Sequence, residues 1–175
     1  MAVTINGSAG VTTNTGAVYD SLQRDTAKSA TGTSVDFTSI PSWVRRITVM
    51  FNGVSTNGTS NIQVQIGSGS FTTSGYLSTA AIISGTNLTS TATFTAGFGL
   101  RAPLNATDIL HGHIVLTAFG NNTWIESNVI GFTTNNYAAY GGGSIALGGI
   151  LDRVRITTVN GTDTFDAGSI NIIYE

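Results

Sequence analysis

The 175-residue chain carries 16 charged side chains, seven basic and nine acidic, which give a net charge of −2. Nucleic-acid binding requires clustered Lys and Arg that neutralise phosphates, so this charge argues against a nucleic-acid partner. The chain has no cysteine, which excludes disulfides and thiolate metal sites, and it has no run of roughly 18 apolar residues such as a membrane span requires.

Composition favours β-structure. Gly, Ser, Thr and Asn supply 81 residues, and 41% of the chain is hydrophobic. These residue types suit short strands joined by tight turns, so the composition predicts an all-β protein. Charged residues make up only 9% of the chain, against about a quarter in a typical soluble domain. We therefore expect part of the surface to be covered by assembly.

The first 32 residues are rich in Gly and Thr and poor in large apolar side chains. We expect residues 1–32 to form an extended N-terminal arm that docks on a neighbouring molecule; the alternative is a frayed terminus. The opening residues 1–7 contain neither the basic nor the apolar region of a secretion signal, so we expect the chain to fold in the cytoplasm that made it.

From residue 33 onward, apolar side chains recur at alternate positions. Ile47, Val49 and Phe51 share one face of a predicted strand, and Val154 and Ile156 share a face of another. The pattern predicts strands over 34–38, 46–52, 62–66, 91–100, 112–119, 123–132, 143–147, 152–159 and 168–174.

Short strands separated by turn signals, without helical periodicity between them, favour an antiparallel arrangement over a parallel α/β sheet. We therefore predict a single jelly-roll-like β-sandwich domain over residues 33–175, preceded by the extended arm. A solenoid would need a fixed repeat of roughly 20 to 50 residues, and the chain shows none.

Three segments resemble a known module. They are residues 35–49, which contain "IPSWVRRI", the dipeptide His111-Gly112, and residues 154–168, whose string "NGTDTFDAGS" extends to Ser169. The run over residues 33–175 is similar to a module of phage and prophage virion proteins that is often the distal domain of tail fibres or tailspikes. The resemblance implies a trimeric, non-enzymatic β-sandwich on the outer surface of a phage particle.

A tail fibre normally has a long shaft before its tip, whereas this chain has only the short arm. We therefore expect a capsid cement, or decoration, protein that forms a homotrimer and binds the major capsid protein. The alternative is a tail fibre or tailspike tip that recognises a host cell-surface glycan. In both cases the expected location is the virion.

Residues 135–143 have the composition of a loop, because two tyrosines lie among amides and glycines. Aromatic rings with neighbouring amides suit contacts with a glycan or a protein. We predict a receptor or partner contact at Asn135, Asn136, Tyr137 and Tyr140. The alternative is that the tyrosines pack on their own subunit.

Asp152, Arg153 and Arg155 form a charged group in a predicted strand, and we expect them to make ion pairs within or between subunits. His111 and His113 would point to one side of their strand. A three-fold axis could gather these imidazoles into a metal site, but we expect ordinary strand-edge histidines. Asp163 and Asp166 are expected to accept backbone N–H bonds in a turn.

Motifs of several enzyme classes are missing, including the Gly-x-Ser-x-Gly elbow, the phosphate-binding loop and the His-Glu-x-x-His zinc motif. We therefore expect no enzymatic activity, no cofactor and no metal.

Overall fold

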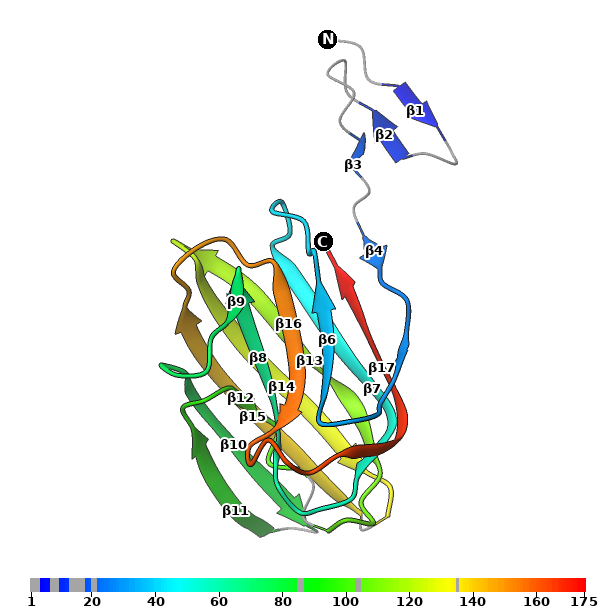
Figure 1. Cartoon of the computed structure of the whole chain (residues 1–175), viewed down its shortest axis with the longest axis vertical. Helices are drawn as coiled ribbons and strands as arrows, with labels where there is room; N and C mark the ends of the chain where they lie inside the picture. The colour runs from blue at the N-terminus through cyan, green and yellow to red at the C-terminus, as the bar shows by residue number, and fades with distance from the viewer. Residues whose placement is uncertain are drawn as a thin grey trace.

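A computed structural model describes residues 4–6, 10–12, 18–19, 22–84, 87–102, 105–134 and 136–175, and the strands of this part of the chain form three sheets (Figure 1). The large sheet has the order β11 (Asn87–Phe94), β10 (Leu77–Ser84), β15 (Tyr137–Ala146), β14 (Thr123–Phe132), β13 (Leu110–Gly120), β7 (Arg46–Thr56), β17 (Phe165–Tyr174) and β4 (Gln23–Arg24), with β5 (Lys28–Ser29) also paired to β17.

The small sheet has the order β12 (Phe98–Gly99), β8 (Ile62–Ser68), β16 (Arg153–Thr158) and β6 (Ser34–Thr38), and β9 (Ser70–Phe71) pairs with β8. A third sheet contains only β1 (Thr4–Asn6), β2 (Gly10–Thr12) and β3 (Val18–Tyr19). The described residues form no helix that could span a membrane.

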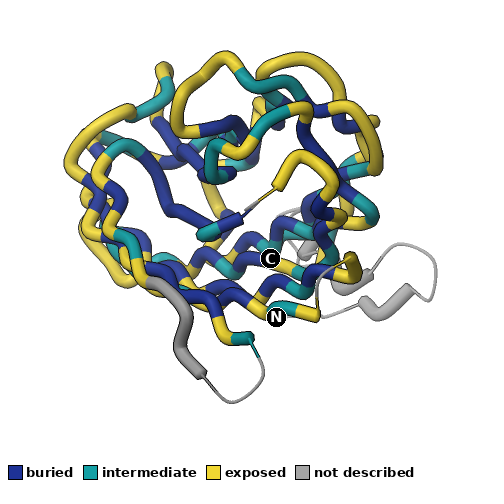
Figure 2. The backbone as a smooth tube through the Cα atoms, turned by 90° about the horizontal axis from the view of Figure 1, so that it is seen from below, coloured by how far each residue is buried: buried dark blue, intermediate teal, exposed yellow. Residues whose placement is uncertain are grey.

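The large and small sheets pack face to face around one hydrophobic core. Ile47 and Val49 of β7, Phe37 of β6 and Val64 of β8 are fully buried in the same cluster. Figure 2 shows the buried residues of the two layers facing each other. This arrangement follows from strand geometry, because alternate side chains point to opposite faces and the apolar set of each strand turns inward.

The prediction of an all-β antiparallel protein is confirmed, since the paired strands of both sheets run antiparallel. The strand order does not establish a jelly roll. In the large sheet, β13, β14 and β15 are consecutive strands that lie side by side as a meander.

The arm predicted for residues 1–32 has two parts. Within the part of the chain that the structure describes, strands β1, β2 and β3 pair only with one another. From β4 onward the chain is attached to the sandwich: β4 and β5 pair with β17, Ala30 is buried, and Phe165 donates its backbone N–H to the Gly32 carbonyl at 2.8 Å. The segment that precedes the sandwich is therefore residues 1–21.

Strand register gives the sandwich two distinct ends. At one, the arm end, Arg46 of β7 pairs with Thr117 of β13, and Tyr174 of β17 pairs with Gln23 of β4. At the other, the far end, Leu110 of β13 pairs with Val54 of β7 and with Phe132 of β14. The chain therefore enters the sandwich at the end where β7 and β14 begin and β13, β15 and β17 finish.

Candidate interaction site

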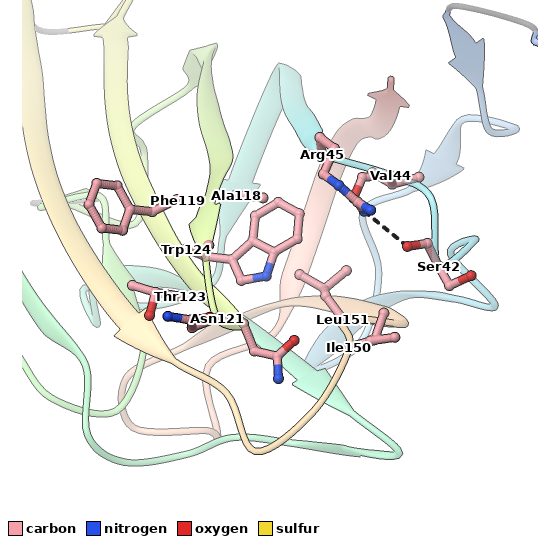
Figure 3. Close-up of a pocket in the computed structure, with 12 residues that line it drawn as sticks. Ser42, Val44, Arg45, Ala118, Phe119, Asn121, Thr123, Trp124, Ile150 and Leu151 are labelled. Carbon is pink, nitrogen blue, oxygen red and sulfur yellow. Dashed lines mark hydrogen bonds between the residues drawn. The ribbon is translucent and has the colours of Figure 1, made fainter.

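A pocket of about 420 Å³ lies at the arm end of the sandwich. Three connections that are far apart in the sequence line it: the segment before β7, the β13–β14 turn and the β15–β16 loop. Figure 3 shows the Trp124 indole on the inner side, with Leu151 and Ile150 from the β15–β16 loop nearby. A volume of this size falls in the range of roughly 300 to 1,000 Å³ that is common for ligand sites.

The floor of this pocket is buried and apolar, and its exposed rim contains polar side chains together with Phe119 and Ile150. Trp124 and Leu151 belong to the hydrophobic core, whereas Asn121 and Asn122 are exposed in the β13–β14 turn. Both asparagines have positive φ angles, 48° and 57°, which Asn tolerates better than most residues in a tight hairpin turn.

The Asn122 carbonyl accepts a hydrogen bond from the Leu147 N–H at 3.0 Å, which ties the turn to the end of β15. Within the described residues, the two Asn side-chain amides make no hydrogen bond, so they are available to a ligand. Arg45 donates from Nη1 to the carbonyls of Ser42 and Val44, so its charge is held against its own loop. The aromatic ring within reach of a ligand is that of Phe119, which is 79% exposed, whereas Trp124 is only 4% exposed. An exposed ring beside free amides can hold an uncharged ring that carries hydroxyl groups.

A second candidate surface is the outward side of the large sheet. Several large apolar side chains there are exposed to solvent, although the sheet interior is well filled. They belong to three neighbouring strands: Leu77 and Ile83 of β10, Tyr140 of β15, and Ile125 and Val129 of β14. Exposed apolar residues gathered on adjacent strands are typical of a surface that meets another molecule.

The predicted contact residues do not converge on one spot. Asn135 lies outside the described residues. Asn136, with a φ of 53°, ends the β14–β15 turn at the far end. Residues 137–143, predicted as a loop, belong instead to strand β15. Tyr137 is partly buried, and its ring packs edge-on against Phe132 with 6.4 Å between the ring centroids, whereas Tyr140 is exposed on the outward side of the sheet.

The predicted charged group makes ion pairs within the chain. Arg155 donates to both carboxylate oxygens of Asp36 on the neighbouring strand β6, at 2.8 and 2.7 Å. Arg153 donates to both oxygens of Asp152, at 2.7 and 3.1 Å, and this bond lowers the pKa of the Asp152 carboxyl. The Arg155 guanidinium also lies 4.0 Å from the centroid of the Phe71 ring. The group therefore holds β6, β16 and β9 together on the outward side of the small sheet.

The two histidines lie on the same side of β13, as the sequence predicted, and the structure shows that this side faces outward. His111 pairs with Gly131 and His113 with Val129 on β14. His111 accepts a hydrogen bond at Nδ1 from the Gly53 N–H at 3.3 Å. The described residues contain no group of three or more His, Cys, Asp or Glu side chains that could hold a metal ion.

The prediction for Asp163 is confirmed, because its carboxylate organises the turn at the far end. It accepts the Ser60 N–H at 2.9 Å and the Asn160 side-chain N–H at 2.7 Å, and these bonds lower its pKa. Asp166 instead bonds to the Ser55 hydroxyl.

Sequence reasoning missed one buried polar pair. Glu126 and Asn128 of β14 point inward and are 2% and 3% exposed. Asn128 donates from Nδ2 to Glu126 Oε1 at 2.6 Å, while Glu126 Oε2 and Asn128 Oδ1 have no partner. Burial raises the pKa of the Glu126 carboxyl to about 7, against the smaller lowering effect of the Asn128 bond.

Comparison of the chain with protein-family models, curated proteins and solved structures found no match in any of the three. The features of the molecule that bear on its function are the arm, the pocket at the arm end and the outward side of the large sheet.

Proposed function

We propose that the chain is a non-enzymatic structural protein of a phage particle, a homotrimeric capsid cement or decoration protein on the outer head surface. The observation that carries the proposal is the separate pairing of β1, β2 and β3, which contribute no strand to the sandwich. The resemblance of residues 33–175 to a virion module supports the same function.

This arrangement suits a protein that is tethered to a shell. The core takes its described residues from Ala30 onward, so residues 1–21 can bind the major capsid protein without unfolding the sandwich. Because the chain enters the sandwich at the arm end, the far end would face away from the shell. Buried apolar area stabilises such a contact by about 25 cal/mol per Å², which accumulates over a lattice of capsid subunits that resists the pressure of packaged DNA.

Deleting residues 1–21 tests this function. We expect the truncated protein to keep its fold and oligomeric state but to bind capsids that lack the native protein at least about tenfold more weakly, because the docking segment is gone. Cosedimentation with purified capsids measures the binding. The full chain should also outnumber tail proteins in purified particles by gel stoichiometry. Undiminished capsid binding by the truncated protein would contradict the proposal.

Recognition of a host surface glycan is the second candidate function, and the pocket at the arm end favours it. A sugar ring can stack on an aromatic side chain while its hydroxyls bond to amides, and the exposed Phe119 with Asn121 offers both groups. This function would belong to a tail fibre or tailspike tip, and no cofactor is needed for it.

The pocket is tested with Asn121→Gly, which removes the amide and accommodates the positive φ of 48°. We expect the affinity for host surface polysaccharide, followed by tryptophan fluorescence, to fall about tenfold for the loss of one or two hydrogen bonds. Asn136→Gly, at a φ of 53° on the far end, is the matched control and should bind normally. A loss confined to the control would assign recognition to the contact set predicted around Asn136.

A further inference from the structure

The outward side of the large sheet presents its exposed apolar residues in register. Val129 of β14 pairs with Tyr140 of β15, which pairs with Ala81 of β10. Two rows nearer the arm end, beyond the uncharged row of Ser127, Gly142 and Thr79, Ile125 pairs with Ser144, which pairs with Leu77. Leu77 is 73% exposed, Val129 56% and Tyr140 46%. Side chains within a row touch across the strands, so these rows place exposed apolar groups on a surface that is otherwise polar and uncharged.

The same side of the sheet is almost free of charge. We call it the neutral face, and it comprises the outward residues of β11, β10, β15, β14, β13 and β7: Thr91, Thr93, Leu77, Thr79, Ala81, Ile83, Ala138, Tyr140, Gly142, Ser144, Ala146, Ile125, Ser127, Val129, Gly131, His111, His113, Val115, Thr117, Arg46, Thr48, Met50 and Asn52. It contains no carboxylate, and its one permanent charge, Arg46, lies at the arm-end corner. Identical copies of such a surface can meet without burying an unpaired charge.

The neutral face is also large enough for a stable interface. Six strands spaced about 4.8 Å apart, each presenting about eight residues of about 3.4 Å, cover about 800 Å². A stable protein interface buries about 800 Å² on each partner.

From this register, charge and area we infer that the neutral face is the contact surface between copies of this chain. In the proposed homotrimer, on which the inference rests, the three neutral faces meet around the symmetry axis. The other outward surface, that of the small sheet, carries the Arg155–Asp36 and Arg153–Asp152 pairs and stays in contact with solvent.

The test places a charge on each surface. Val129→Lys puts an ammonium in the middle of the neutral face, whereas Thr38→Lys puts one at an exposed strand position of the small sheet. By sedimentation at micromolar concentration we expect the wild type and Thr38→Lys to be trimers. Val129→Lys should associate at least about a hundredfold more weakly, because each interface would bury an uncompensated charge. Thermal unfolding verifies that both variants fold.

A second measurement needs no disruptive change. The chain has no cysteine, so a single introduced one can be labelled selectively. We expect a maleimide to label Val129→Cys at least about tenfold more slowly than Thr38→Cys in the assembled protein, because burial blocks access to the thiol. A monomeric wild type, an intact Val129→Lys oligomer or equal labelling rates would overturn the inference. If the protein is a trimer with the expected labelling and association but does not bind capsids, the proposed cement function is wrong while the inferred contact surface between copies stands.

Discussion

Raising the pH from 5 to 8 is expected to lower the free energy of unfolding by about 2 to 3 kcal/mol through Glu126 alone. The pKa of this carboxyl is about 7 in the folded protein, against an ordinary value of 4.5. The folded state therefore holds the proton more tightly than the unfolded state. The contribution of Glu126 to stability is largest below pH 4.5, falls as the pH rises from 4.5 to 7, and levels off above 7.

The local hydrogen bonds explain why the proton is retained. With a charged carboxylate, Glu126 Oε2 and Asn128 Oδ1 are two buried acceptors without a donor. A protonated Glu126 supplies a hydroxyl that can donate to the Asn128 oxygen, while Asn128 Nδ2 already donates to Glu126 Oε1 at 2.6 Å. Its partners on the neighbouring strands, Leu116 and Gly143, are not titratable, and no charged side chain contributes to the shift.

Glu126→Gln is the direct test, because the Gln amide offers one acceptor and a permanent donor to Asn128. Chemical denaturation at pH 5 and pH 8 should show a variant about 2 to 3 kcal/mol more stable than the wild type at pH 8 and closer to it at pH 5. Glu175→Gln is the control, since Glu175 forms an exposed pair with Arg46 and should leave the pH dependence unchanged. A wild type with equal stability at both pH values would refute the role of Glu126.

The sequence predicted the strands whose two faces differ in polarity. Strand β6 begins and ends where the alternation predicted, at 34–38, and β14 was also found at its predicted bounds, 123–132, although its alternation did not show which face turns inward. Strand β10 was missed, because both of its faces carry apolar residues: Ala80 and Ile82 point into the core, while Leu77 and Ile83 point outward. A strand that is apolar on both sides shows no alternation. Strand β10, which the sequence did not predict, therefore contributes apolar side chains to the neutral face.

For Glu126, the sequence did not show which of the two faces of β14 turns inward. The even positions of β14 include Trp124, Glu126 and Asn128, and the odd ones include Ile125 and Val129, so composition alone does not decide which set turns inward. The even-numbered residues turn inward because that side of β14 packs against the small sheet. The pocket could not be predicted from the sequence either. Its lining comes from three connections separated by up to about a hundred residues, and no local residue spacing shows that they lie together in the fold.

The glycine run of β15 was misinterpreted for a related reason. Residues 141–143 have the composition of a flexible loop, but two of them are required by packing. A Cβ on Gly141 would lie 2.7 Å from the Asn128 side-chain nitrogen, and one on Gly143 would lie 2.6 Å from the Leu77 carbonyl oxygen. Glycine here permits close approach within a strand, a role that sequence cannot distinguish from flexibility.

Gly168→Ala is expected to lower the free energy of unfolding by about 3 kcal/mol or more. Gly168 forms a bulge in β17, between the pairs Ala167–Ser55 and Ser169–Asn52, with a φ of 88°. A Cβ at this position would lie 2.3 Å from the Gly53 carbonyl oxygen and 2.6 Å from the Val54 nitrogen. These atoms belong to the backbone of the central strand β7, so they cannot rotate away as a side chain could.

Gly161→Ala separates the conformational cost from the steric one. Gly161 has a φ of 68°, but a Cβ there would meet no atom within 4 Å. Its substitution should cost about 1 kcal/mol, the ordinary penalty for alanine in the left-handed region. Urea denaturation of both variants gives the comparison. Equal losses would show that the strands β7 and β17 can separate at the bulge. A much larger loss for Gly168→Ala would show that the close contact between Gly53 and Gly168 fixes the register that carries the last strand onto the large sheet.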